Sequence, residues 1–241
     1  MGTSSARRGP TTGLWRAAKG AATRYLSPGA AGEVSAREVV ARYLAALSET
    51  PGAGEALAAF RVTRKAAQDL GALWQEAAAR GWGLALKDRG LGPLAGEPAD
   101  MLAPAVSGLV AGGGGGLEDA VVRTALASVL GPALQSRQQP APAHVVRQFL
   151  ITALHLRLAL DLGEPLEAAA GSFGRLREGL SRIKAVIEAG AGAAGGPPEP
   201  PATPGLWQGF AGWTWVTEVM AGLIQNLEPG GPPDRPNDPG R

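Results

Sequence analysis

The sequence predicts an all-α protein, a helical bundle of about six or seven helices with flexible Gly/Pro-rich linkers and tails. From residue 35 onward, apolar residues recur at spacings of three and four positions, which is the period of one face of an α-helix. The 36 glycines and 20 prolines gather in particular stretches, which are therefore expected to be linkers or tails. No stretch shows the alternation of polar and apolar residues that is typical of a strand.

Composition and charge limit the class of protein. Hydrophobic residues make up 45% of the 241 positions, which is enough for a real core. The absence of cysteine excludes disulfides, thiol nucleophiles and thiolate metal sites, and leaves the cellular compartment open. Five of the 23 basic residues precede Glu33, the first acidic residue. The basic character therefore belongs to an N-terminal arm, residues 1–32, and the rest of the chain is mildly acidic.

The arm contains a predicted amphipathic helix over residues 12–26. A helical wheel places its apolar side chains on one arc and its basic side chains on the other. Such a helix is suited to an anionic membrane surface or the groove of an acidic partner. The residues that would make this contact are Leu14, Trp15, Arg16, Lys19, Arg24 and Tyr25. The alternatives are a helix packed on the body, a disordered arm, or a mitochondrial transit peptide, which is also Arg-rich and free of acids.

The bundle is expected over residues 33–190. The segments with helical periodicity are 35–47, 54 to about 81 or 83, 99–110, 117–137, 144–163 and 164–190. Ser35 and Glu38 have the spacing of a capping box at the start of the first segment. In the third segment, Pro104 is expected in the first turn, where a missing N–H is tolerated. Residues 87–98 read as a loop.

The five glycines at positions 112–116 raise the question of a phosphate-binding loop. Bare backbone N–H groups can hold phosphate oxygens. However, no GK[ST] follows, Leu117 breaks the GxGxxG register, and no strand is evident before the glycines. The stretch is therefore expected to be a flexible connector, and the sequence predicts no cofactor.

Residues 144–163 are apolar on almost every side, which is typical of a helix at the centre of a bundle. Arg147 and Arg157 lie within this segment and make it a poor membrane span. In the following segment, an apolar seam is flanked by basic residues. We expect these basic residues to form a solvated face in preference to a nucleic-acid contact. The seam consists of Leu176, Leu180, Ile183 and Ile187, and its basic neighbours include Arg175, Arg177, Arg182 and Lys184.

Two stretches are too rich in Gly and Pro to form regular structure. Residues 191–204 are expected to be a Gly/Pro linker that is partly stiffened as polyproline II. Residues 229–241 are expected to be a disordered tail.

Between linker and tail, residues 205–228 contain three tryptophans within nine positions and are expected to form a Trp-rich docking helix. Its polar side chains share one strip, which favours a helix docked by one face over a transmembrane anchor. Trp207 and Trp215 fall outside the apolar arc, so docking by that arc would leave them at its edge or in solvent. Because tryptophan is enriched at interface hot spots, we predict a partner-binding site at Trp207, Trp213, Trp215 and Phe210. The alternative is that these tryptophans cap the end of the bundle or lie on other helices, and the sequence does not decide whether the segment docks on its own chain or on a neighbouring subunit.

No catalytic or metal-binding residues are predicted. His144 and His155 are the two histidines, and eleven positions on one helix separate them by about 16 Å, too far to share a metal ion. No GxSxG motif is present.

The sequence thus predicts a non-catalytic scaffold, adaptor or assembly subunit that acts through a protein partner or self-association as an oligomer. The alternative is a peripheral membrane protein anchored by residues 12–26. A third hypothesis is a nucleic-acid-binding subunit that uses the arm with Arg175, Arg182 and Lys184. We expect the protein to be cytoplasmic, with membrane association as the alternative. In a eukaryote, a mitochondrial location is the further alternative.

Overall fold

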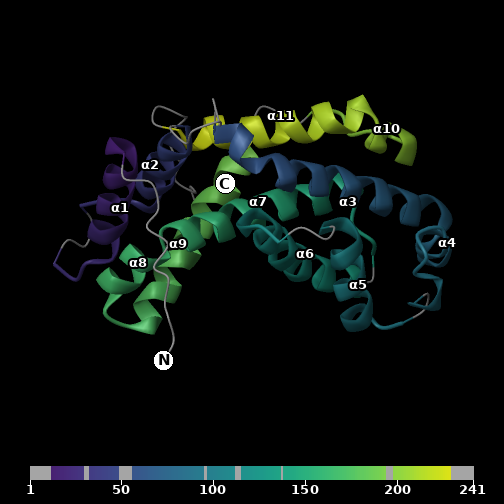
Figure 1. Cartoon of the computed structure of the whole chain (residues 1–241), viewed down its shortest axis with the longest axis horizontal. Coiled ribbons are helices and arrows are strands. Elements are labelled where there is room, and N and C mark those ends of the chain that lie inside the picture. Colours follow the sequence, from purple (N-terminus) through teal and green to yellow (C-terminus); the bar gives the residue numbers. More distant parts are fainter. Residues whose placement is uncertain are drawn as a thin grey trace, which may run out of the picture. The chain divides into compact units, whose positions relative to one another are not determined.

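The computed structural model describes residues 12–29, 33–48, 56–94, 97–111, 115–136, 138–193 and 198–228. Within these ranges it contains eleven α-helices, two 3-10 helices and no strand, so the predicted all-α fold is confirmed (Figure 1). The elements are α1 (Gly13–Leu26), α2 (Ala36–Ser48), η1 (Ala56–Phe60), α3 (Arg61–Arg80), α4 (Trp82–Lys87), η2 (Gly92–Leu94), α5 (Ala99–Ala111), α6 (Leu117–Gln135), α7 (Pro142–Asp161), α8 (Gly163–Ala170), α9 (Phe173–Ala193), α10 (Pro204–Gln208) and α11 (Phe210–Leu227).

The helices outnumber the expected six or seven because three periodic segments are divided near glycines. Gly81 separates α3 from α4 and has φ 84°, a left-handed conformation that glycine adopts without strain. Gly171, with φ 65°, ends α8 in a left-handed conformation, and Gly209 separates α10 from α11. Residues 1–11, 112–114 and 229–241, which include the expected tail and most of the glycine connector, lie outside the described residues.

Local sequence signals explain several helix starts. The Ser35 hydroxyl accepts the Glu38 N–H at 3.1 Å, as the predicted capping box requires, whereas the Glu38 carboxylate pairs with Arg42 at 2.7 Å. At the start of α6, Asp119 accepts the Gly116 N–H at 2.8 Å. Pro104 was expected in the first turn of its helix, but it lies inside α5, which already begins at Ala99.

The chain divides into two compact units, each assembled from separate stretches. Unit 1 comprises Met1–Ala59, Leu158–Gly190 and Ile224–Arg241, and unit 2 comprises Phe60–Arg157 and Ala191–Leu223. Residues 33–190, which we expected to form one bundle, therefore contribute to both units. The division follows helix packing and not the order of segments along the chain.

In unit 1, α1 packs against α2 and α8 (Figure 1). Trp15 of α1 is buried and meets Tyr43 of α2 edge to face, with ring centroids 5.9 Å apart. The end of α11 also belongs to this unit. Arg37 donates a hydrogen bond to the carbonyl oxygen of Asn226 at 2.7 Å, and the Asn226 amide donates to the carbonyl oxygen of Gly190 at 3.0 Å. Helices far apart in sequence thus hold unit 1 together.

In unit 2, α3 packs against α4, α5, α6 and α10, and α5 packs against α6. Trp74 of α3 is fully buried, stacks edge to face on Trp82 at 5.0 Å, and donates its Nε1–H to the carbonyl oxygen of Pro140. Glu118 of α6 accepts hydrogen bonds from both the backbone N–H and the hydroxyl of Thr63. The first turn of α3 is thereby fixed to the first turn of α6.

Candidate functional site

The Trp-rich segment, predicted as one helix over residues 205–228, forms two helices. Pro204 opens α10 after Thr203, whose hydroxyl accepts the Leu206 N–H at 3.3 Å. Gly209 ends α10, and its carbonyl oxygen accepts a hydrogen bond from the Gln68 amide of α3 at 2.9 Å. The break changes the direction of the side chains that precede it, so a single helical wheel does not describe the segment.

Trp207 is fully buried, and so the expectation that it lies at the edge of the docked face or in solvent is wrong. Its ring packs on α3 at Gly71, and its backbone lies against Gly212 of α11. A Cβ at Gly212 would come within 1.9 Å of the Trp207 carbonyl oxygen. The glycine break allows this close approach, because α10 and α11 are separate helices that meet at Trp207.

Trp215 is also buried, against the same expectation. It meets Trp207 edge to face with ring centroids 5.0 Å apart, and its Nε1–H donates to the carbonyl oxygen of Pro198 at 2.9 Å. The guanidinium carbon of Arg147 lies 5.9 Å from the centroid of the Trp215 ring. Burial lowers the pKa of Arg147 below its usual value, but an arginine remains charged at neutral pH. Trp215 therefore links α10, α7 and the segment after α9.

Trp213 is half-buried and is covered by a second arginine. The guanidinium carbon of Arg64 lies 4.6 Å from the ring centroid, within range of a cation–π interaction. The same guanidinium donates a hydrogen bond to the Thr217 hydroxyl at 3.0 Å. Desolvation lowers the pKa of Arg64, while the charge of Glu118 raises it. Arg64 of α3 thus holds the outer side of α11.

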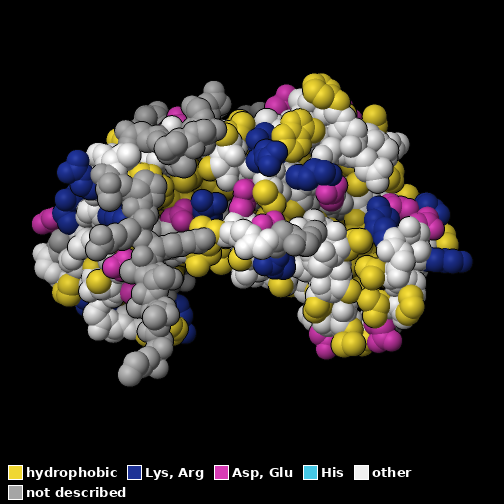
Figure 2. All heavy atoms as spheres, viewed as in Figure 1, with side chains coloured by type: hydrophobic (Ala, Val, Ile, Leu, Met, Phe, Trp, Pro, Cys, Tyr) yellow, Lys and Arg dark blue, Asp and Glu magenta, His cyan; other side chains and the backbone are white. Residues whose placement is uncertain are grey.

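These contacts dock the segment on its own chain within unit 2. They leave apolar side chains exposed at the junction. Phe210 is 83% exposed and Leu206 is 49% exposed. Phe210 and Trp213 are three positions apart on α11 and so lie on one side of it. We call Leu206, Phe210 and Trp213 the elbow surface. Figure 2 shows exposed hydrophobic side chains over α10 and the start of α11, with Lys or Arg side chains beside them.

Of the four predicted partner-binding residues, the structure therefore leaves Phe210 and part of Trp213 accessible. Trp207 and Trp215 are internal anchors. Leu206 was not among the predicted residues, because a helical wheel that treats residues 205–228 as one helix places Leu206 on the apolar arc with Val216 and Leu223. The signal that could have revealed it is Gly209, between two short runs of helix formers.

The residues predicted to contact a membrane do not form an open surface in unit 1. Trp15 is 4% exposed, and the Tyr25 hydroxyl donates to the carbonyl oxygen of Gly179 at 3.1 Å. Leu14, Arg16 and Arg24 are exposed, and Lys19 is half-buried. The apolar arc of α1 is thus covered by the body, which was one of the alternatives. No helix within the described ranges is long and apolar enough to cross a membrane.

Two basic residues of the proposed nucleic-acid contact are engaged in ion pairs along α9. Arg182 pairs with Glu178, and Lys184 lies 3.7 Å from Glu188. In the part of the chain that the structure describes, no cluster of His, Asp and Glu side chains is arranged to hold a metal ion.

Comparison with known proteins gives one family. Residues 51–194 match the family model described as QatB, the Qat anti-phage system associated protein QatB. The match covers η1 and the whole of α3 to α9, and it ends before α10. No curated protein and no solved structure matches the chain.

Proposed function

Since the chain belongs to the QatB family, we propose that it is a non-catalytic subunit of the Qat anti-phage system that binds another component through the elbow surface. The observation that carries this proposal is the position of Phe210. Its side chain is 83% exposed although it begins a helix whose next two tryptophans are held by the body of unit 2.

The anchoring of α10 and α11 supports a contact role. Trp207 and Trp215 are buried. Arg64 of α3 binds Thr217 on α11, and Gln68 of α3 binds the carbonyl oxygen of Gly209 between the two helices. A fixed backbone lowers the entropy lost when a partner covers the surface. An exposed aromatic side chain beside a half-buried tryptophan is the kind of anchor that dominates interface energies.

The same contacts support a non-catalytic role. The buried polar side chains nearest the elbow surface are occupied in holding helices together: Arg64 binds Thr217, and Gln68 binds the Gly209 carbonyl. These side chains stabilise the helices that carry the elbow surface.

The test is co-expression of the full chain with the other components of the Qat system, followed by affinity purification of the tagged chain. Phe210→Asp should reduce the yield of the bound component by about tenfold or more, because a charge would be buried in an apolar contact. The matched control is Phe173→Asp, which changes the other highly exposed phenylalanine, 77% exposed at the start of α9 in unit 1.

The control should retain the component at the level of the unaltered chain, and both variants should keep the helical circular dichroism spectrum. Equal retention by both variants would overturn the assignment to the elbow surface. Equal loss by both variants would also overturn it, because the effect would then not depend on position. A homo-oligomer that Phe210→Asp dissociates, with no second component bound, would replace the heteromeric proposal with self-association.

A further inference from the structure

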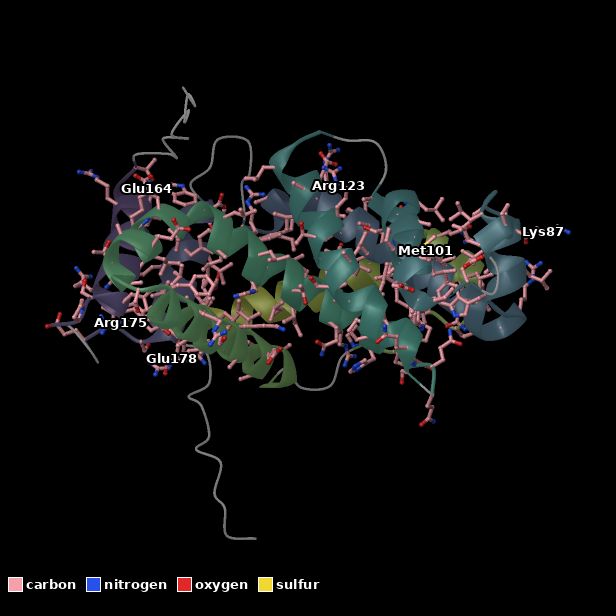
Figure 3. All side chains as sticks on the ribbon, turned by 90° about the horizontal axis from the view of Figure 1, so that it is seen from below. Lys87, Met101, Arg123, Glu164, Arg175 and Glu178 are labelled. Atoms are coloured by element: carbon pink, nitrogen blue, oxygen red, sulfur yellow. The ribbon has the colours of Figure 1, made fainter. Side chains whose placement is uncertain are left out.

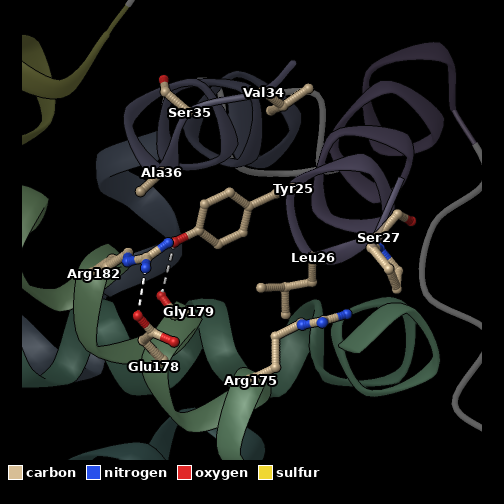
Figure 4. A pocket seen from close by; sticks show the side chains of 11 residues that line it. Tyr25, Leu26, Ser27, Val34, Ser35, Ala36, Arg175, Glu178, Gly179 and Arg182 are labelled. Carbon is tan, nitrogen blue, oxygen red and sulfur yellow. Dashed lines mark hydrogen bonds and ion pairs between the residues drawn. The ribbon is translucent and has the colours of Figure 1, made fainter. Parts of the chain in front are cut away.

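A pocket of about 420 Å³ lies within unit 1, between α1, the start of α2 and α9 (Figure 4). Its volume falls in the range of about 300–1,000 Å³ that is typical of small-molecule sites. The last turn of α1 forms one side, the residues around Ser35 form the second, and the first three turns of α9 form the third. None of the residues that line the pocket belongs to the elbow surface.

The apolar wall of the pocket is rigid. Leu26 and Val34 are 5% and 6% exposed and line it together with the ring of Tyr25. Leu26 packs so closely on α9 that a Cβ at Gly179 would lie 2.5 Å from its Cδ2. The Tyr25 hydroxyl donates to the Gly179 carbonyl oxygen, which fixes the ring between α1 and α9 (Figure 4).

The Tyr25 phenol is neutral at physiological pH. Burial raises the pKa of Tyr25 above its ordinary value, although the charge of Arg182 acts in the opposite direction. The ring therefore offers a planar, uncharged face to a ligand, and the phenol retains the proton that it donates to Gly179.

The polar side of the pocket carries an uneven set of charges. Glu178 pairs with Arg182, so these two charges compensate each other. Arg175 also lines the pocket, and no carboxylate of the described residues forms a salt bridge with it. Figure 3 labels Arg175 and Glu178 toward one end of α9, and Figure 4 shows the Arg175 guanidinium pointing away from the Glu178 carboxylate. Among the described residues, the pocket thus has one arginine without a salt-bridge partner, and a carboxylate acceptor, Glu178, on the other side of Leu26 (Figure 4).

We infer that this pocket binds a nucleoside monophosphate. Its phosphate would pair with Arg175, which as a guanidinium can bind two phosphate oxygens at once. Its base would lie against Leu26, Val34 and the Tyr25 ring, since aromatic and aliphatic faces accept a planar base.

The spacing along α9 supports this orientation. Glu178 follows Arg175 by about 4.5 Å of helix rise, so hydroxyl or amino groups of the same ligand can donate to its carboxylate. A single arginine without a salt-bridge partner among the described residues matches one phosphate. The Ser35 hydroxyl, which accepts from Glu38, still has its own hydrogen to donate.

The experiment is isothermal titration calorimetry of the full chain with each of AMP, GMP, CMP and UMP, and with adenosine and inorganic phosphate as separate arms. At least one nucleotide should bind with a dissociation constant below about 1 mM. Adenosine and phosphate should each bind at least about tenfold more weakly than the preferred nucleotide, because each makes half of the contacts. Failure of all four nucleotides to bind would overturn the inference.

Two variants of exposed α9 residues locate the site. Arg175→Ala should weaken binding of the preferred nucleotide by about tenfold or more, through loss of a charged hydrogen bond. Arg177→Ala is the matched control, because Arg177 is equally exposed on α9 but does not line the pocket. It should change the affinity by less than about twofold. Equal effects of the two variants would indicate general charge attraction and would overturn the assignment to this pocket.

A third variant tests the role of Glu178. Glu178→Gln should reduce the preference for the nucleotide over inorganic phosphate, because the carboxylate accepts only from the nucleoside part and repels the phosphate. An unchanged preference would contradict the proposed orientation. None of these variants alters Leu206, Phe210 or Trp213, so the outcome is independent of the partner-binding proposal.

Discussion

A Cβ atom placed on Gly71 would lie 2.3 Å from Cε3 of Trp207, closer than any carbon contact in a folded protein. Gly71 is in the middle of α3, where glycine weakens a helix by about 0.5–1 kcal/mol relative to alanine. At this position the missing side chain is what permits α10 to dock. This pair of residues therefore controls whether the elbow surface is held in place.

Gly71→Ala should accordingly lower the free energy of unfolding by about 1–3 kcal/mol, because the new methyl group displaces the Trp207 ring. Gly108→Ala in α5 is the control, since nothing lies within 4 Å of its Cβ position. It should raise the free energy of unfolding by about 0.5–1 kcal/mol. Urea denaturation followed by circular dichroism distinguishes the two, and a stabilising Gly71→Ala would contradict the described packing of Trp207.

The stacking of Arg64 on Trp213 should appear as a coupling free energy. A double-mutant cycle with Arg64→Met and Trp213→Leu should give about 0.5–2 kcal/mol of coupling in the free energy of unfolding. A cycle is needed because removing a desolvated charge also removes its desolvation cost. The parallel cycle with Arg61→Met, an exposed arginine of the same helix, should give a coupling near zero. Equal couplings in the two cycles would show that the interaction is not specific to Arg64.

The raised pKa of Tyr25 predicts that the free energy of unfolding falls at alkaline pH. Its pKa is higher in the folded protein than in the unfolded chain, chiefly because of burial. The folded state therefore favours the neutral phenol, and this contribution is complete below about pH 10, the ordinary pKa of tyrosine. It is lost as the pH rises through the folded-state pKa.

Tyr25→Phe should cost about 0.5–1.5 kcal/mol at pH 8, since the hydrogen bond to Gly179 is lost. The difference in free energy of unfolding between the unaltered chain and Tyr25→Phe should then shrink as the pH rises above 10. Urea titrations at pH 8 to 11 measure this difference. A difference that grows with pH would contradict the direction of the shift.

The covering of α1 predicts weak membrane association. Trp15 and Leu26 are buried and Tyr25 is half-buried, so of the large apolar side chains of α1 only Leu14 is exposed for insertion. In co-sedimentation with phosphatidylcholine–phosphatidylserine vesicles, the full chain should remain in the supernatant at physiological salt. Pelleting that Arg16→Glu and Arg24→Glu abolish would show instead that α1 leaves the body and binds the membrane.

Short-range signals account for the parts of the fold that the sequence predicted. The Ser35 cap, the acidic first turn of α6 and the buried seam residues Ile183 and Ile187 depend on neighbours within a few turns. The all-α class follows from such patterns because each helix must bury one apolar stripe.

The misread parts depend on contacts between distant residues. Trp207 was predicted from a wheel that assumed an unbroken helix, and the single Gly209 is a weak signal against that assumption. The pocket in unit 1 joins Tyr25 to Gly179 across the chain, and no local pattern indicates such a pair. Phe210 and Trp213 were predicted because aromatic residues are enriched at interface hot spots, whereas a single leucine such as Leu206 carries no such signal.

The contribution of both chain regions to unit 1 has a consequence for synthesis on the ribosome. Arg37 is translated 189 residues before its hydrogen-bond acceptor, Asn226. Unit 1 therefore cannot complete its packing until the final turns of α11 have left the exit tunnel. Until then the contacts of Asn226 and Leu227 with Arg37 and Gly190 are missing, although α1 can already pack on α2 and α8.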